Sequence, residues 1–167
     1  MTIDEFNALP PDELREALFA CCASVTWVEH LATLGPFHSQ DHLINMAERC
    51  WHKCREGDWM DALSGHPRLG NLESLEEKFQ NTSDAAAEEQ SGTQGASREV
   101  LEELAVANEE YEKEFGFRFI LFATNKTADT MLSALQVRLK NDLETEKIMA
   151  MVEQNKIARL RLEKLLS

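Results

Sequence analysis

One loop of the sequence presents a histidine in a setting suited to proton transfer. His66 lies in the segment Gly65–Gly70, which reads Gly-His-Pro-Arg-Leu-Gly. Because proline cannot continue a helix interior and pushes the preceding residue toward extended backbone, we expect His66 at a break between helices. An imidazole exchanges protons near neutral pH, so His66 is a candidate general acid or base. The local pattern leaves one alternative open, a loop histidine hydrogen-bonded to a neighbouring carbonyl.

Two adjacent acidic residues stand at the predicted end of a short helix. This helix, over residues 84–90, would be capped by Thr82 or Ser83. Glu88 and Glu89 then lie in its last turn, where a carboxylate opposes the helix dipole. The unfavourable placement indicates that at least one of these acids serves something other than stability. A solvated polar turn is the alternative.

Cysteines and histidines in one stretch of the chain suggest a metal site. Spacings of four would place His38 with His42, and Cys50 with Cys54, on shared helix faces, with His52 between the cysteines. Structural zinc sites usually take two pairs of ligands separated by short loops. Buried free cysteine commonly behaves as a small hydrophobic residue, so we expect these cysteines in a core and no metal. A metal-binding helical protein remains an alternative.

The elements that must position these residues are predicted to be helices. Apolar residues recur at intervals of three and four along most of the chain. The first expected helix starts at Leu9–Glu13, with proline tolerated in its first turn, and keeps helical spacing to Val25. The other expected helical segments are a short segment around Trp27 and Leu31, residues 43–54 with a break at Gly57–Asp58, residues 101–111 with an end before Gly116, residues 127–141 and residues 143–166. Phe117–Ala123 could be a strand, or a buried extended or helical linker. The pattern predicts an all-α, single-domain helical bundle.

Composition sets the class of protein. At 167 residues and 43% hydrophobic content, the chain is expected to form one domain over residues 1–167. A net charge of -13 argues against binding to nucleic acid or to an anionic membrane surface. No apolar run approaches the roughly 20 residues that span a bilayer. The first residues lack a basic leader and an apolar signal core, and the four cysteines form no disulfide framework, so we expect a cytoplasmic protein.

These features, in this order, resemble the 2-oxo-4-hydroxy-4-carboxy-5-ureidoimidazoline (OHCU) decarboxylases of urate catabolism. The similarity runs nearly from end to end. It is carried by the segments Phe6–Pro10, Cys21–Trp27, Pro36–Phe37, Gly65–Gly70, Glu89–Gln90, Asn108–Tyr111, Phe115–Ile120 and Glu153–Leu162. The resemblance implies a cofactor-free lyase with a helical-bundle fold, commonly a homodimer, which converts OHCU to (S)-allantoin and carbon dioxide.

The resemblance also implies site residues. His66 and Glu89 match the catalytic pair of the family, and the substrate-binding positions are Pro67, Ala86, Gln90, and the backbone of Phe119, Ile120, Leu121, Phe122 and Ala123. The family commonly has serine where this chain has Ala86, so one hydroxyl contact is missing or is replaced. A helical interaction module would also explain the acidic surface, but it gives no reason for a constrained histidine or for acids at a helix end.

Overall fold

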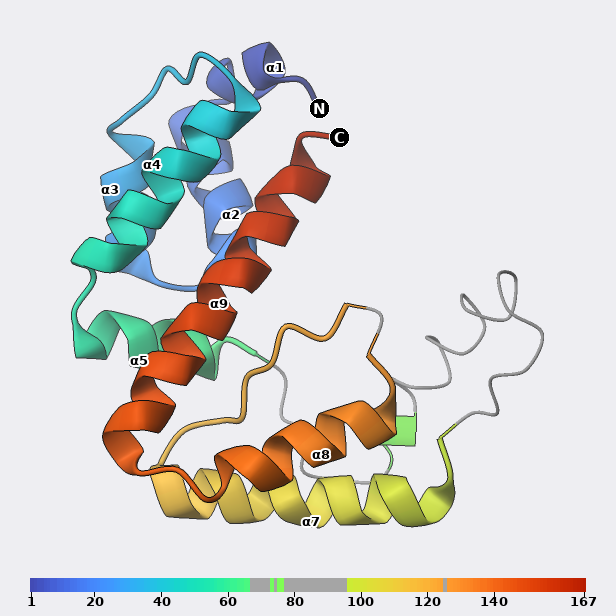
Figure 1. Ribbon diagram of the computed structural model, residues 1–167. Helices are drawn as coiled ribbons and strands as arrows, with labels where there is room; N and C mark the ends of the chain where they lie inside the picture. The colour runs from blue at the N-terminus through green and yellow to red at the C-terminus, as the bar shows by residue number, and fades with distance from the viewer. Residues whose placement is uncertain (67–72, 74, 77–95, 125) are drawn as a thin grey trace. The chain divides into compact units, whose positions relative to one another are not determined.

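The computed structural model of the chain describes residues 1–66, 73, 75–76, 96–124 and 126–167. Within these ranges every regular element is an α-helix, as Figure 1 shows. The helices are α1 (Ile3–Asn7), α2 (Pro11–Cys21), α3 (Val25–Ala32), α4 (Gln40–Lys53), α5 (Glu56–Ser64), α7 (Arg98–Phe115), α8 (Ala128–Arg138) and α9 (Leu143–Leu165). The prediction of an all-α fold is therefore confirmed. The expected helix over residues 84–90 lies outside the described residues.

The contacts divide the chain into two compact units. The terminal unit comprises residues 1–66 and 149–167, and the central unit comprises residues 67–148. The single domain over residues 1–167 stays a prediction, because two compact units of one domain can share a single folding transition. None of the helices in the described ranges has the length and apolar content that crossing a bilayer requires.

The core of the terminal unit contains two buried tryptophans whose indole N–H groups are both hydrogen-bonded. Trp27 Nε1 donates to the Ala47 carbonyl at 2.9 Å, and Trp51 Nε1 donates to the Met151 carbonyl at 3.0 Å. Both rings are buried. Because a buried N–H without a partner is costly, these bonds let the tryptophans contribute their large apolar surface. The remaining core includes Phe6, Leu18, Cys22, Leu31, Phe37, Leu43, Cys50, Cys54 and Leu162.

Two of the expected helix boundaries are wrong, and capping side chains explain both. The helical spacing continues to Val25, yet α2 ends at Cys21, because Ser24 accepts a hydrogen bond from the Trp27 N–H at 3.3 Å and starts α3. The predicted break at Gly57–Asp58 lies inside α5. The break comes earlier, because Asp58 Oδ2 accepts from the Arg55 N–H at 2.8 Å and so begins the helix before the glycine.

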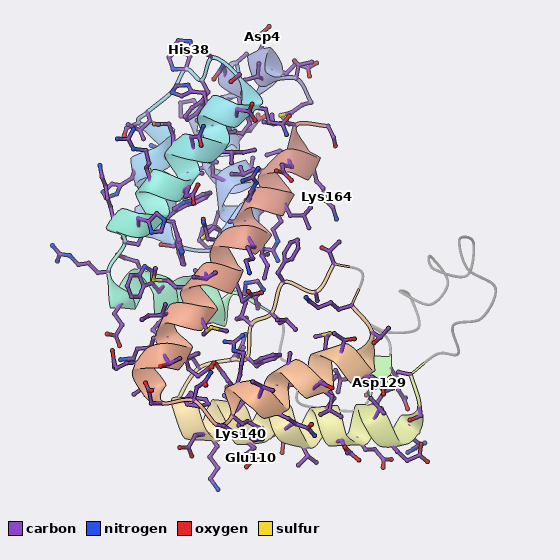
Figure 2. The ribbon with its side chains drawn as sticks, in the orientation of Figure 1. Asp4, His38, Glu110, Asp129, Lys140 and Lys164 are labelled. Atoms are coloured by element: carbon purple, nitrogen blue, oxygen red, sulfur yellow. The ribbon has the colours of Figure 1, made fainter. Side chains whose placement is uncertain are left out.

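The central unit is built around α7 and α8. The predicted apolar face of α7 is buried at Leu101, Leu104 and Tyr111, while charged side chains such as Glu110 on α7 and Asp129 on α8 are exposed (Figure 2). Gly116 ends α7 with a φ of 80°, in the left-handed region that glycine adopts without strain. This turn leads into residues 117–123, which are neither helix nor strand.

Candidate active site

His66 lies directly after α5, at the helix break that the sequence predicts. Its N–H donates to the Leu63 carbonyl at 3.3 Å, and its side chain is half-buried. Gly65, the residue before it, caps the helix. The backbone at His66 is thus held by the last turn of α5.

Gly65 is required because the chain passes close to Ala23 at this point. A Cβ added at Gly65 would lie 2.5 Å from the Ala23 Cβ, which is far inside van der Waals contact. Ala23 lies in the short connection between α2 and α3. Since neither group is the end of a flexible side chain, any larger residue at position 65 must move the backbone that carries His66.

Gly65→Ala should therefore destabilise the protein by about 1–3 kcal/mol, the usual cost of forcing extra volume into a packed site. Adding Ala23→Gly should relieve the clash, so the double variant should be more stable than Gly65→Ala alone. Urea unfolding of the two single variants and the double variant measures this coupling. Strictly additive free energies of unfolding would contradict the close approach.

The imidazole of His66 contacts one side chain of α9. His66 Nε2 hydrogen-bonds Gln154 Oε1, within the terminal unit. Gln154 is 0% exposed, and its amide Nε2 is buried without a partner of good hydrogen-bond geometry in the described part of the chain. The Cys22 thiol lies beside this amide, and burial raises the pKa of Cys22 to about 12, although hydrogen bonding to Gln154 lowers it. Cys22 therefore stays a neutral thiol at physiological pH.

The backbone segment predicted to bind the heterocycle lies in the central unit. Phe119 and Ile120 are buried, and the next three residues, Leu121, Phe122 and Ala123, are half-buried. Arg138 Nη1 donates to the Ile120 carbonyl at 2.6 Å, and the guanidinium lies 4.8 Å from the centre of the Phe119 ring. One arginine therefore holds the start of the segment through both its backbone and its side chain.

Arg138 is itself fixed by a buried ion pair. Its Nη2 lies 2.8 Å from Glu146 Oε2, and the two side chains are 4% and 0% exposed. Tyr111 donates its hydroxyl proton to the same carboxylate, and Asn141 Nδ2 donates to Glu146 Oε1 at 2.8 Å. Burial, followed by the bond to Glu146, raises the pKa of Tyr111 above its ordinary value, so the phenol keeps its proton. The carboxylate thus has donors on both oxygens, as a buried charge requires.

Arg138, which holds Ile120, and Gln154, which contacts His66, were not predicted from the sequence, although weak signals for both existed. Arg138 occurs three residues after the buried Leu135, so a charged side chain falls on an apolar helix face. Gln154 belongs to the segment Glu153–Leu162 that carried the family resemblance, but no role followed from its type alone. The predicted Pro67, Ala86, Glu89 and Gln90 lie outside the described residues, and their roles stay predictions.

The structure places the cysteines and histidines that were weighed as metal ligands in different surroundings. Cys50 and Cys54 are buried in the core as free thiols, as expected, and burial raises the pKa of Cys54 to about 11. His52 lies on the exposed side of α4, 3.9 Å from Glu48, and His38 stacks on His42 with ring centres 5.0 Å apart. Among residues 1–66, 96–124 and the other described positions, no group of three or more potential ligands is placed to hold a metal ion.

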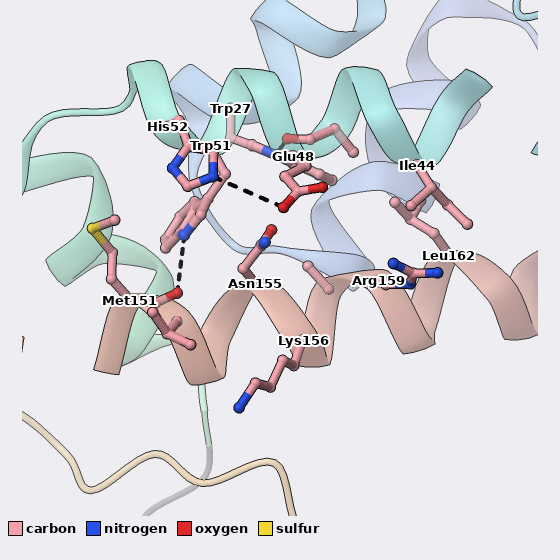
Figure 3. Close-up of a pocket in the computed structure, with 13 residues that line it drawn as sticks. Trp27, Ile44, Glu48, Trp51, His52, Met151, Asn155, Lys156, Arg159 and Leu162 are labelled. Atoms are coloured by element: carbon pink, nitrogen blue, oxygen red, sulfur yellow. Dashed lines mark hydrogen bonds and ion pairs between the residues drawn. The ribbon is translucent and has the colours of Figure 1, made fainter. Parts of the chain in front are cut away.

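A cavity of about 300 Å³ lies between α4 and α9 in the terminal unit (Figure 3). Trp27, Trp51 and Leu162 contribute apolar walls, and Asn155 and Lys156 contribute polar groups. Neither His66 nor any residue of 119–123 lines it. Among the described residues of the terminal unit, the candidate catalytic residue His66 is therefore not part of the cavity lining.

Comparison with solved structures shows the class of protein to which the fold belongs. The chain resembles a crystal structure of OHCU decarboxylase in the presence of (S)-allantoin, with a TM-score of 0.73 and 34% identity over 89% of this chain and 95% of that chain. It also shares its fold with a crystal structure of (S)-allantoin synthase, with a TM-score of 0.71 at 21% identity. That similarity covers 98% of this chain and 54% of the other. The helical fold is thus that of the OHCU decarboxylase class.

The family follows from the sequence match. The profile described as OHCU decarboxylase matches residues 7–163, and the chain belongs to this family. The uric acid degradation bifunctional protein TTL of Arabidopsis thaliana is 34% identical over 147 residues, which are 88% of this chain and 45% of that protein. The OHCU decarboxylase of Haloferax volcanii is 28% identical over 97% of this chain and 94% of its own length. The chain therefore spans less than half of the bifunctional relative and nearly all of the Haloferax volcanii relative.

Proposed function

We propose that the chain decarboxylates OHCU to (S)-allantoin and carbon dioxide in urate breakdown, without a cofactor. The observation that carries the proposal is the 34% identity to an OHCU decarboxylase structure obtained in the presence of (S)-allantoin, over 89% of the chain. The family membership over residues 7–163 supports it. The position of His66 at the end of α5 supplies a candidate for the proton chemistry.

The substrate accounts for a site that needs no cofactor. The OHCU carboxylate is attached to a ring carbon next to a C=N bond, which accepts the electron pair when the bond to the carboxylate breaks and carbon dioxide leaves. One proton must then be delivered to one face of the neighbouring carbon to give (S)-allantoin. A positioned histidine suits this step, because the stereochemistry of the product depends on the direction from which the proton comes.

The remaining site residues take proposed roles from the family resemblance. Glu89 orients His66 or binds the donors of the ureido or hydroxyl groups, and Gln90 matches a urea-like edge with one donor and one acceptor group. Pro67 and Ala86 border the substrate. Backbone N–H groups across residues 119–123 hold the ring and its carbonyl, and the Arg138 bond to the Ile120 carbonyl supports this part of the proposal by keeping the segment in one conformation.

The activity is tested by generating fresh OHCU from urate and following circular dichroism. Spontaneous decay of OHCU gives racemic allantoin, so an enzyme adds a dichroic signal. We expect the purified chain to accelerate the appearance of (S)-allantoin. A time course identical to that of OHCU alone would rule out the proposed function.

We further propose that the chain forms a homodimer and acts in the cytoplasm. The family resemblance supports the homodimer. All four cysteines are buried free thiols, which fits the reducing conditions of the cytoplasm.

A further inference from the structure

We propose that Arg138 is a positioning residue that acts by its charge: through the Ile120 carbonyl it orients the next N–H, that of Leu121, and strengthens it as a donor to the reacting ring. The inference deepens the proposed function and rests on it for the contact between residues 119–123 and the substrate. It starts from the hydrogen bond of 2.6 Å that Arg138 Nη1 donates to the Ile120 carbonyl. The groups that carry the inference all lie in the central unit.

The geometry of one peptide bond fixes the direction of the Leu121 N–H. The bond between Ile120 and Leu121 is trans, so its carbonyl and its N–H point in opposite directions. Because the carbonyl points to Arg138, whose side chain is only 4% exposed, the N–H points away from that buried network. Leu121 is half-buried, and no backbone hydrogen bond within the described residues uses its N–H. This N–H is therefore placed to bond a ligand.

The positive charge of Arg138 makes this N–H a better donor. A hydrogen bond from a charged group draws electron density toward the carbonyl oxygen, and the polarised peptide then donates more strongly from its own N–H. The guanidinium is fixed beside the carbonyl, because its Nη2 lies 2.8 Å from Glu146 Oε2 and its centre lies 4.8 Å from the centre of the Phe119 ring. The donor is thus oriented and polarised before any substrate arrives.

The decarboxylation needs such a donor most in its transition state. When the bond to the carboxylate breaks, its electron pair moves into the ring through the C=N bond and carbon dioxide leaves. The negative charge passes from the carboxylate to the ring, where it stays until a proton is added to the neighbouring carbon. A donor already aimed at the ring stabilises this charge more than it stabilises the substrate. Arg138 gives up no proton and touches no reacting atom.

The amide resonance of Leu121 tests the geometry without any substrate. A hydrogen bond to a carbonyl oxygen moves the ¹⁵N and ¹H resonances of the N–H in the same peptide bond to higher frequency. Arg138→Met should therefore move the Leu121 resonances to lower frequency, and by more than those of Ala123. Arg98→Met removes an exposed arginine of α7 and should leave them in place. Unmoved Leu121 resonances in folded Arg138→Met would overturn the proposal, whether or not the protein acts on OHCU.

Turnover separates the charge of Arg138 from its part in the fold. Arg138→Met and Glu146→Gln break the same ion pair, but only Glu146→Gln keeps the positive charge at the Ile120 carbonyl. Losing one preorganised donor costs roughly 10²- to 10³-fold in kcat, so weakening one by Arg138→Met should lower kcat by about 5- to 50-fold, with a smaller change in KM. Glu146→Gln should lower kcat by less than ~3-fold, because the donor stays polarised. Arg138→Lys keeps a charge and should lose less than Arg138→Met.

Equal losses of kcat in folded Arg138→Met and folded Glu146→Gln would mean that the ion pair only holds the fold, and would contradict a role for the charge. If Arg138→Met does not fold, the double variant with Glu146→Leu takes its place, because it leaves no stranded carboxylate. A loss confined to KM would likewise contradict action in the transition state. If wild type fails to accelerate OHCU decay, the proposed function fails, while the Leu121 resonances still decide whether Arg138 sets this peptide bond.

Discussion

His66→Ala should lower kcat for OHCU decarboxylation by about 10²- to 10⁴-fold, the typical contribution of a general acid or base. The fold should persist, because the His66 side chain is half-buried and lies after the end of α5 rather than in the apolar core. The measurement is the initial rate of (S)-allantoin formation by circular dichroism, together with the thermal unfolding midpoint. KM should change less than kcat, because the proton is delivered in the transition state.

A matched control is His52→Ala. His52 is also a histidine of the terminal unit, but its side chain is 61% exposed on α4 and its Nε2 lies 3.9 Å from Glu48 Oε1. This substitution should leave kcat within a factor of about two, because surface changes away from a site rarely alter it. Wild-type turnover in folded His66→Ala would remove His66 from the proton chemistry and would leave Glu89 as the remaining proposed catalytic group.

Arg138→Met should destabilise the protein by about 3–5 kcal/mol, the cost of removing one partner of a buried ion pair. The substitution leaves the carboxylate of Glu146 buried without its counter-charge, and the Ile120 carbonyl loses its donor at 2.6 Å. Urea unfolding followed by far-ultraviolet circular dichroism measures the change. OHCU turnover should fall as well, because the segment 119–123 loses the contact that holds Ile120.

Two further variants separate the charge from the packing. Arg98→Met also removes an arginine from an ion pair, but that pair with Glu102 is exposed, with 71% of the Arg98 side chain accessible, so it should cost at most about 1 kcal/mol. Adding Glu146→Leu to Arg138→Met removes the stranded charge and should restore part of the stability. Equal losses in Arg98→Met and Arg138→Met would mean that the buried pair has no special part in the fold.

The sequence predicted those helix ends that depend on one residue. Pro11 begins α2 because its missing N–H costs nothing in the first turn, and Gly116 ends α7 because only a residue tolerant of positive φ fits there. The end of α2 was wrong because the apolar spacing continues past it, while a single hydroxyl of Ser24 starts the next helix. Capping by Ser24 sets that boundary, and the spacing of apolar residues does not reveal a cap.

In the candidate site, too, the sequence predicted what neighbouring residues determine and missed what distant residues determine. His66 was predictable because Pro67, the next residue in the sequence, restricts the His66 backbone. The anchors of the site were not, because each joins distant parts of the sequence: Gln154 lies 88 residues from His66, and Arg138 lies 18 residues from Ile120. A charged or amide side chain has the same appearance in the sequence whether it is solvated or buried with a partner. Only the fold brings the partner to it.

Tyr111 and the tryptophans give the protein two optical reporters, one in each compact unit. The chain has 1 tyrosine, and its phenol is held by Glu146 and Arg138 in the central unit. Its 3 tryptophans, Trp27, Trp51 and Trp59, all belong to the terminal unit. Tryptophan fluorescence therefore follows the opening of one unit, and phenolate absorbance at alkaline pH follows the opening of the other, since Tyr111 ionises readily only after it leaves its buried network. The natural sequence thus allows the unfolding of each unit to be timed without an added label.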